Sequence, residues 1–528
     1  MPRSSLRAMI GAGVVVKAFL LALVAVAPLG GLSQTLSPLA RAWPVLLAPG
    51  RAIFGDAAVG TSVPSERGWP ALALFAALLV GASCAAALAA GYGLRVRAPD
   101  RRFLALALGG AALFGATLVL LPSLPSDDVF SYILYGRIAA VHGANPLVAT
   151  PGDFPADPFL SLVFWRGTRS VYGPAWLLLS HGLTLLAQAL GGSLAVYTLL
   201  FKLLGFAAHL ANAALIWAIL GRIAPGRRVF GTLLYAWNPL CLLEFCASAH
   251  NDALMLTLAL LGIYCLACGW EAPALVSFGL SIAIKYVLLA LLPFYLFWQA
   301  WRLWQHGERR ITALGLALGW RLGLALGVVA LTTLPYWAGA ATLGAILYSP
   351  PAQQLDNSLL DTVSWPLRAL AQALGMPAAT AAKLTQTALK ALALLVFLGL
   401  WLAQLRRATS LIGMIASWAW ALFWYVVVAS GWFWPWYVTW VVALAALLAP
   451  GELVTAALLL AGGALTLYAF LPLYATPVYG FRSLLAFGPA LGYLLYQHRA
   501  WLRGRLSQVS ATLARHSKLG LILRGHTS

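Results

Sequence analysis

The run AVYTLLFKLLGFAAHLANAALIWAILG, residues 195–221, contains Lys202 as its one charged side chain and is long enough to cross a bilayer. About 20 consecutive apolar residues span the hydrocarbon core as a helix. Similar runs recur along the whole chain, which is 62% hydrophobic and 9% charged over 528 residues, with a mean hydropathy of +0.86. Soluble domains need a more polar surface than this. The sequence therefore predicts an all-α, polytopic helical membrane protein.

We expect about 13–14 transmembrane helices. The first run is followed by no convincing small-residue cleavage site, so we interpret it as a retained helix. The candidate segments lie near 8–30, 70–92, 103–122, 195–221, 229–248, 252–269, 273–287, 288–304, 312–336, 384–405, 409–430, 436–449, 453–471 and 482–499.

The net charge of +20 does not indicate a nucleic-acid partner, because the basic residues form short clusters between apolar segments. Cytoplasmic loops of membrane proteins are enriched in Lys and Arg. If both termini lie in the cytoplasm, most of the basic residues also lie on the cytoplasmic side of the membrane. This topology allows no full span at 173–192, which we expect to be an interfacial helix within a large outer loop, 123–194.

We divide the chain into an N-terminal transmembrane hairpin (1–92), a catalytic transmembrane domain (93–499) and a basic cytoplasmic tail (500–528). The predicted localisation is a bacterial-type plasma membrane, with multiple spans and with the active site on the outer face.

Two adjacent acids, Asp127 and Asp128, stand at the start of the outer loop in a chain with only 14 Asp or Glu residues. Ser126 before them is a good helix N-cap, and carboxylates stabilise the first turn of a helix. A carboxylate held there and facing a cleft could equally accept a proton from a sugar hydroxyl. The residues alone leave capping and catalysis equally weighted, and the two roles are compatible.

The rest of the outer loop alternates turn formers with aromatic residues, which is typical of an ordered loop. It could also bind a sugar and a lipid phosphate, because aromatic rings stack on sugars and Arg pairs with phosphate. The candidate binding residues here are Tyr135, Arg137, His142, Asn145, Arg169 and Tyr172.

Further along, His250, Asn251 and Asp252 follow Glu244 at the outer edge of a predicted span. They could simply begin a helix. Ionisable groups at membrane depth are costly and indicate functional sites, which favours function here. Lys285 needs a partner for the same reason, as do Lys202 and Arg321, although Lys side chains can also extend to the membrane surface.

A dense group of aromatic residues around Pro435 includes Trp434 and Trp436, and Arg482 follows a second aromatic segment. Interfacial belts are the usual explanation for Trp and Tyr at this depth. The density also fits a wall for an acceptor or a polyprenyl chain, and Arg482 is a candidate phosphate contact.

The sequence contains no motif for disulfide, zinc, nucleotide or serine-hydrolase chemistry. The five cysteines lie in apolar runs and imply neither a disulfide framework nor a zinc site. The chain contains no Walker loop, dinucleotide fingerprint or G-x-S-x-G elbow. The energy for any reaction must come from an activated membrane substrate or a gradient.

Four motifs of the outer loop, taken together, resemble the C-type glycosyltransferase (GT-C) superfamily. They are Asp127-Asp128-Val-Phe-Ser-Tyr, Tyr-Gly-Arg137, His142-Gly-Ala-Asn-Pro and Ser170-Val-Tyr-Gly-Pro. The His250-Asn251-Asp252 stretch is similar to polyprenol-phosphomannose-dependent α-mannosyltransferases, as are the Lys285 segment and the Pro435-Trp-Tyr turn. The resemblance covers most of residues 103–490, and residues 1–92 add nothing to it.

This resemblance implies that a sugar, mannose or another hexose, moves from a polyprenyl-phosphate donor to a hydroxyl of a glycan or glycolipid acceptor, with inversion. Asp127 or Asp128 would be the base. Arg169, Lys285 and Arg482 would contact phosphate, and His250 and Asp252 would shape the pocket.

No cofactor is implied with certainty. Binding of a divalent cation, Mg²⁺ or Mn²⁺, is a further possibility, because the carboxylates of Asp127, Asp128 and Asp252 could lie close together in the fold. The alternative function is a transporter or a flippase for lipid-linked glycans, in which the intramembrane charges would carry the substrate. Polar residues concentrated on one side of the membrane favour the enzyme.

Overall fold

The computed structural model describes residues 2–26, 35–54, 68–347, 353–471 and 477–500. Within these residues ten helices are long and apolar enough to cross a membrane. Six are α1 (Pro2–Val26), α4 (Gly68–Gly93), α5 (Arg101–Val119), α8 (Leu194–Ile223), α18 (Ala378–Leu405) and α21 (Glu452–Phe470). In the other four, an α-helix is continuous with a short 3₁₀- or π-helical turn: Tyr286–Gln305 with α13 (Leu292–Gln305), Ile311–Tyr336 with α14 (Ile311–Thr333), Leu411–Ala429 with α19 (Leu411–Trp424) and Val478–Gln497 with α22 (Arg482–Gln497). The all-α membrane architecture is confirmed.

The remaining predicted spans correspond to shorter or broken helices. One further pair of helices is long and apolar enough only when taken together, as a broken span or a re-entrant loop. It is bent by 51° between Pro225–Ala236, which includes α9 (Arg228–Ala236), and Pro239–Ala247, which comprises α10 (Pro239–Leu242) and the π-helix η6 (Leu243–Ala247). The short apolar helices are α11 (Asp252–Ala267), α12 (Glu271–Ile284) and the segment Pro435–Ala445, which contains α20 (Val438–Ala445). The predicted tail, 500–528, lies outside the described residues apart from Ala500.

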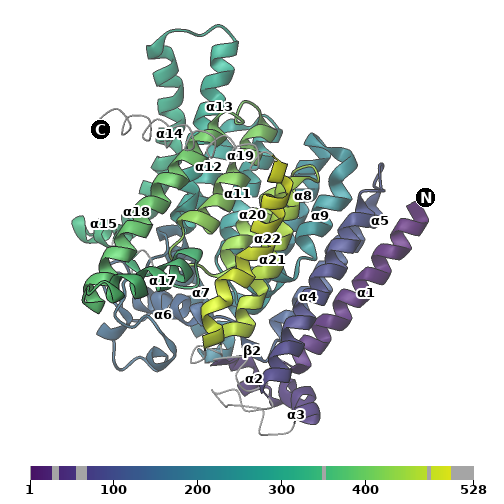
Figure 1. Ribbon diagram of the computed structural model, residues 1–528, viewed down its shortest axis with the longest axis vertical. Coiled ribbons are helices and arrows are strands. Elements are labelled where there is room, and N and C mark those ends of the chain that lie inside the picture. The colour runs from purple at the N-terminus through teal and green to yellow at the C-terminus, as the bar shows by residue number, and fades with distance from the viewer. Residues whose placement is uncertain (1, 27–34, 55–67, 348–352, 472–476, 501–528) are drawn as a thin grey trace, which may run out of the picture.

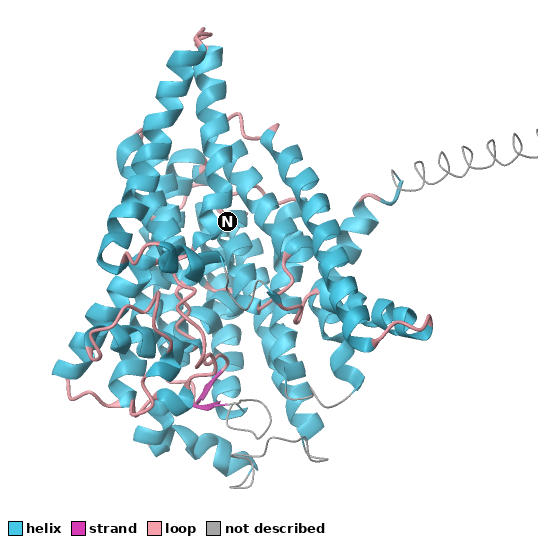
Figure 2. Ribbon diagram, turned by 90° about the vertical axis from the view of Figure 1, so that its left-hand side faces the viewer, coloured by secondary structure: helices cyan, strands magenta, loops and turns pink. Residues whose placement is uncertain are grey.

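Long connections gather at one end of the helical bundle, which we call the loop end (Figure 1). It contains α2 (Pro38–Ala42), α3 (Ala48–Phe54), α6 (Asp128–Ala140), α7 (Pro174–Ala189) and α17 (Leu359–Ala373). The turn between α13 and α14, with Arg302, Arg309 and Arg310, lies at the opposite end. Figure 2 shows the irregular segments and the two short strands in the same half of the molecule. The long connections and the basic turn thus lie at opposite ends of the bundle, as the distribution of basic residues along the sequence predicts.

The N-terminal hairpin is attached to the outer-loop segment through a small strand pair. In β1 (Thr35–Leu36) and β2 (Ser123–Leu124), Thr35 pairs with Leu124 and Leu36 with Ser123, antiparallel. The Ser37 N–H also donates to the Pro122 carbonyl at 2.9 Å. Residues 35–37 therefore fix the backbone just before the aspartate pair.

Helix α7, where the interfacial helix was expected, spans 16 residues and packs against α6. Gly136 allows the close approach, because a Cβ there would lie 2.5 Å from the Ser180 carbonyl oxygen. One face of α7 is buried, through Trp176 and Leu177, whereas Leu178 and Leu185 on the other face are exposed. That division suits a helix lying at an interface, and its depth in the membrane stays a prediction.

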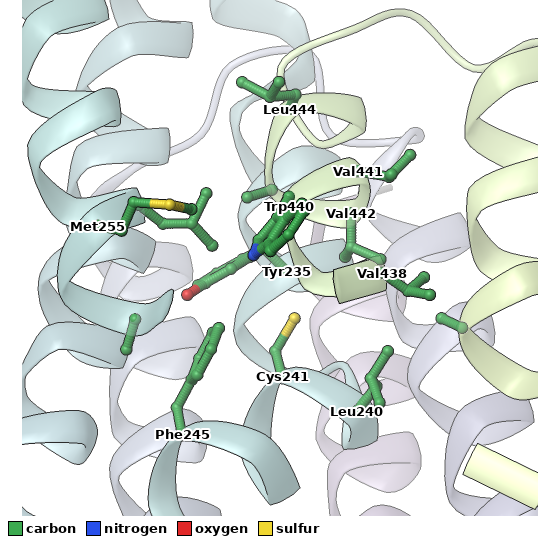
Figure 3. Packing of buried hydrophobic residues seen from close by; sticks show 14 of the residues in the cluster. Tyr235, Leu240, Cys241, Phe245, Met255, Val438, Trp440, Val441, Val442 and Leu444 are labelled. Carbon is green, nitrogen blue, oxygen red and sulfur yellow. The ribbon is translucent and has the colours of Figure 1, made fainter. Parts of the chain in front are cut away.

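The centre of the bundle is a tightly packed apolar core that ends against the polar site described below. Figure 3 shows Trp440 among Tyr235, Met255 and Val438, with Phe245 and Cys241 beneath. Trp440 and Tyr235 are fully buried. Trp440 thus lies between the apolar core and the charged residues at the start of α11.

Two cations within the spans have partners, as expected for charges at membrane depth. Lys202 is buried and donates to the Val119 carbonyl at 3.0 Å, at the C-terminal end of α5. Arg321 forms a bidentate pair with Glu271 at 2.8 Å for each nitrogen, and the Tyr295 hydroxyl donates to the same carboxylate at 2.6 Å. Both groups lie in structural contacts between helices.

Candidate active site

The aspartate pair begins helix α6, one residue later than the sequence predicted. Asp127 is the N-cap residue and Asp128 is the first helical residue. The Ser126 hydroxyl still accepts the Asp128 N–H, at 3.3 Å. Both aspartates are half-buried. The helix start therefore fixes the backbone of both acids, and the two side chains lie side by side in a half-buried position.

Asp128 has a carboxylate whose protonation is tuned by its surroundings. Burial raises its pKa to about 6, and neighbouring Asp252 and Asp127 also act to raise it. Positive charge on Lys285 and a hydrogen bond from Tyr172, 3.3 Å long, act in the opposite direction. A pKa close to the working pH is what a general base requires.

Lys285 and Asp252 form an ion pair opposite this carboxylate. The Lys285 ammonium donates to both Asp252 oxygens, at 2.8 and 3.0 Å, and the Trp440 indole N–H donates to Oδ1 at 2.6 Å. Lys285 also lies 5.3 Å from the ring centroids of Tyr437 and Trp440. Asp252 is fully buried, whereas 20% of the Lys285 side chain is exposed. The ammonium is therefore the accessible member of the pair.

Gly173 brings the two halves of the site together. Its N–H donates to the Ile284 carbonyl at 3.0 Å, and a Cβ at this position would lie 2.1 Å from the Ala283 carbonyl oxygen. The loop carrying Tyr172 thus lies directly on the end of α12, where Lys285 follows. Only a residue without a side chain permits this contact.

Tyr132 belongs to the site and was absent from the predicted residues. Its ring makes edge contacts with Tyr172 and Trp176, with both pairs of centroids 4.9 Å apart. Its hydroxyl accepts the Asn251 N–H at 3.5 Å. The i, i+4 spacing from Asp128 places both side chains on one face of α6, which was the available signal.

His250 and Asn251 follow a distorted turn of backbone. The π-helix η6 precedes Ala249, which adopts a left-handed φ of 60°. Such conformations are strained and concentrate at functional sites. His250 stacks on Trp436, with centroids 4.0 Å apart. Within the described residues, the His250 ring nitrogens and the Asn251 side-chain amide have no hydrogen-bond partner, although all are buried.

Glu244 lies beneath His250. One carboxylate oxygen accepts from the Tyr468 hydroxyl at 2.6 Å, and the other lies 3.6 Å from His250 Nδ1. These side chains extend the polar site inward from Asp252.

Several predicted binding residues of the outer loop hold that loop together instead of facing Asp128. Arg137 pairs with Asp157 at 2.9 Å and donates to the Tyr197 hydroxyl at 3.1 Å, and His142 contacts the same carboxylate at 2.8 Å. Burial alone would raise the pKa of Asp157, but hydrogen bonds from His142, a backbone N–H and Arg137 lower it below its ordinary value. Arg137 also lies nine residues along α6 from Asp128, which is about 13 Å.

Tyr135 and Asn145 have similar structural contacts. The Tyr135 hydroxyl donates to the Thr168 carbonyl at 2.8 Å. The Asn145 amide donates to the Tyr336 carbonyl at 2.7 Å and accepts the Leu147 N–H at 2.9 Å. Substrate binding by these residues stays a prediction.

The two candidate phosphate-binding arginines differ in their exposure and in their hydrogen bonds. Arg169 is exposed, and it forms no hydrogen bond or ion pair with the part of the chain that the structure describes. Arg482 is 2% exposed, and it donates to Asp361 at 2.6 Å, Asp356 at 3.2 Å and Asn357 at 2.6 Å. A phosphate could reach Arg482 only if these bonds broke.

The acids do not form a cation site. No three His, Cys, Asp or Glu side chains among the described residues are grouped to hold a metal ion. Both Asp252 oxygens accept from Lys285, so a cation there would have to displace the ammonium. These residues do not fit a divalent ion, and none enters the steps below.

Comparisons with known proteins identify one family and two curated relatives that match part of the chain, and the family match includes Asp127 to Lys285. Residues 66–301 match a family described as Alpha-(1->6)-mannopyranosyltransferase, N-terminal domain. Alpha-(1->6)-mannopyranosyltransferase A of Mycobacterium tuberculosis is 27% identical over 254 residues, 42% of this chain and 48% of the relative. A probable alpha-(1->6)-mannopyranosyltransferase of Mycolicibacterium smegmatis is 29% identical over 156 residues, 28% of this chain and 27% of the relative.

The chain spans about half the length, or less, of these curated relatives. The comparisons confirm the resemblance to membrane α-mannosyltransferases that the motifs indicated, and they support a glycosyltransferase. Trp434, Trp436 and Arg482 lie beyond residues 66–301, which the family matches.

Proposed function

We propose that this chain is a membrane mannosyltransferase that moves mannose from a polyprenyl-phosphate donor to an α-(1→6)-linked mannan acceptor, with inversion. The relatives are named as α-(1→6)-mannopyranosyltransferases, which supports the sugar and the linkage. The observation that carries the proposal is the presence, in one site, of the Asp128 carboxylate, which accepts a hydrogen bond from Tyr172, and of the partly exposed Lys285 ammonium, whose charge acts on that carboxylate. Group transfer from a phosphate needs both.

Asp128 is the proposed base. Its carboxylate accepts the proton of an acceptor hydroxyl while that oxygen forms a bond to the anomeric carbon of mannose. The bond between the anomeric carbon and the phosphate oxygen breaks, and polyprenyl phosphate leaves with the electron pair. Attack from the face opposite the phosphate inverts the configuration. The hydrogen bond from Tyr172 and the nearby charge of Lys285 favour Asp128 over Asp127 for this role.

Lys285 is the proposed contact of the departing phosphate. An ammonium has three N–H donors, and Asp252 accepts two of them here. The third can bond a phosphate oxygen, while Asp252 and Trp440 hold the side chain in place. Arg169, exposed in the outer loop, is a second cation available to the phosphate or to the acceptor.

The site lies at the loop end, and the distribution of basic residues supports placing this end on the outer face of the membrane. A polyprenyl-phosphate donor suits that location, because its lipid keeps the sugar at the surface where soluble nucleotide sugars are absent. The alternative, a transporter, finds less support because the relatives are named as transferases.

The test uses the full chain in lipid nanodiscs with polyprenyl-phosphomannose and an α-(1→6)-linked mannose tetrasaccharide. We expect a pentasaccharide and an equal amount of released polyprenyl phosphate, both formed roughly 10²- to 10⁴-fold more slowly in Asp128→Asn. Incorporation from GDP-mannose without any polyprenyl phosphate would overturn the donor assignment. Movement of the donor lipid across a vesicle membrane without transfer would instead favour the transporter.

A further inference from the structure

A continuous series of aromatic rings runs from the charged site to the outer loop. Behind His250 and Trp436, the Trp436 and Trp434 rings stack with centroids 5.2 Å apart and an interplanar angle of 9°. Trp434 and Trp432 follow at 6.1 Å, and Trp432 and Trp165 at 5.7 Å. Trp165 and Trp434 come from segments far apart in the sequence, so tertiary packing creates the series.

The outer rings of the series are more exposed than Trp436, the ring next to the charged site. Trp436 is 6% exposed, whereas Trp434, Trp432 and Trp165 are half-buried. Phe164, which contacts Trp165 with centroids 5.0 Å apart, is 77% exposed. Core packing explains the inner ring, because large aromatic side chains fill apolar interiors. It does not explain three partly exposed tryptophan rings in a row, followed by an exposed phenylalanine.

The backbone of the row is held from behind by the buried Arg482 cluster. The Asp356 N–H donates to the Gly431 carbonyl at 2.8 Å, and the Phe433 N–H donates to the Asp356 carbonyl at 3.0 Å, on either side of Trp432. Arg482 bonds the Asp356 side chain at 3.2 Å. The Asp356 carboxylate is still 31% exposed, so it can also accept hydrogen bonds from outside.

We propose that Trp434, Trp432 and Trp165, together with the Asp356 carboxylate, form an extended binding site for the sugar chain of the acceptor. The transferase would then select acceptors by their length. This inference rests on the proposed function and deepens it, because it names the part of the acceptor that is recognised away from the reacting hydroxyl.

The chemistry of the row fits a glycan better than a polyprenyl chain. Pyranose rings present C–H faces that pack on aromatic rings and hydroxyl edges that donate to carboxylates. A hydrocarbon chain would gain nothing from Asp356 and would leave that carboxylate poorly solvated. Aromatic rings beside one exposed carboxylate are therefore suited to successive sugar units.

The experiment compares transfer to α-(1→6)-linked mannose disaccharide and hexasaccharide. In Trp165→Ala we expect the KM for the hexasaccharide to rise about tenfold, which corresponds to losing one stacking contact. The KM for the disaccharide and both kcat values should stay near wild type, and Trp165→Phe should recover most of the loss. Asp356→Asn should also raise the hexasaccharide KM alone.

Trp337→Ala is the matched control, because Trp337 is 56% exposed but does not belong to the row. It should leave both KM values unchanged. An equal KM rise for both acceptors in Trp165→Ala, or an unchanged hexasaccharide KM, would overturn the proposal.

Binding without donor separates this inference from the proposed function. Saturation-transfer NMR with the same two oligosaccharides reports contact even if the wild-type protein transfers no sugar. Preference for the hexasaccharide that is lost in Trp165→Ala would support the extended site on its own. No preference in the wild-type protein would exclude it, whatever the outcome of the transfer assay.

Discussion

Lys285 and Asp252, 33 residues apart, form a bidentate ion pair in which only the lysine is accessible. Asp252 is fixed at the start of α11 and receives a third hydrogen bond from Trp440. Lys285 lies in the extended backbone between α12 and η7 (Tyr286–Leu291), with φ −151° and ψ 123°. The pair thus holds a positive charge near Asp128 at the junction of α12 and η7, where the backbone is extended.

Single substitutions separate the two aspartates. We expect Asp128→Asn to lower kcat by roughly 10²- to 10⁴-fold, because the amide cannot accept the acceptor proton. Asp127→Asn should retain much more activity, since its helix-capping position tolerates Asn. Rates of polyprenyl-phosphate release, measured on variants of equal monodispersity, give the comparison. The opposite ranking would move the role of the base to Asp127.

The pH profile reports the protonation of Asp128. Because the base must be ionised and its pKa is about 6, kcat/KM should fall about tenfold per pH unit below pH 6. Lys285 lowers this pKa, so Lys285→Met should move the acidic limb to higher pH as well as slowing transfer. A profile that stays flat to pH 4.5 in the wild-type protein would contradict the assignment.

Stability should depend on pH with the opposite sign. The folded-state pKa of Asp128 is raised from its ordinary value of 3.8, so the group favours the folded state only while it is protonated. This contribution is lost as the pH rises through about 6. Asp128→Asn should therefore melt at a higher temperature than the wild type at pH 8, and the difference should shrink toward pH 4. Thermal unfolding in detergent at the two pH values measures it.

Gly173→Ala tests the contact between the outer loop and α12. The new Cβ would overlap the Ala283 carbonyl oxygen, which forces the loop carrying Tyr172 away from Lys285. Displacement of about 1 Å costs on the order of 10²-fold in rate, so we expect a loss of that size together with a lower Tm. Gly167→Ala is the control in the same loop, because a Cβ at Gly167 would have no atom within 4 Å among the described residues. Equal effects of both substitutions would argue against the contact.

A double-mutant cycle measures the ion pair. Lys285→Met leaves Asp252 buried without its counter-charge and should destabilise the protein by on the order of 3 kcal/mol. Adding Asp252→Asn removes the isolated charge and should restore most of that stability without restoring transfer. Denaturant or thermal unfolding of the four proteins gives the coupling energy. Additive effects would show that the two side chains do not interact in the folded protein.

Much of the site could be predicted because its signals are local. The residues around Asp127 and Asp128 predict a helix start, and the structure differs only in making Asp127 the cap in place of Ser126. The expected partners for Lys285, Lys202 and Arg321 are present. Tyr132 and Trp440 were missed because aromatic residues in apolar runs normally indicate core packing.

Residues with long-range contacts were harder to interpret. Arg482 was expected to contact phosphate, but it lies against Asp356 and Asp361, more than 120 residues earlier in the chain. Arg137 and His142 share Asp157 within the outer loop, which no spacing rule indicates. A charge in the sequence shows that a partner is needed and leaves open which group provides it.

The sequence by itself determined the helical membrane architecture, because twenty apolar residues can satisfy their backbone in lipid only as a helix. It also determined that the two aspartates begin a helix, since capping depends on adjacent residues. Only the tertiary structure decided which charges meet. Lys285 reaches Asp252 and Trp440, and Trp165 reaches Trp432, because those contacts depend on how separate helices and loops pack and not on their spacing along the chain.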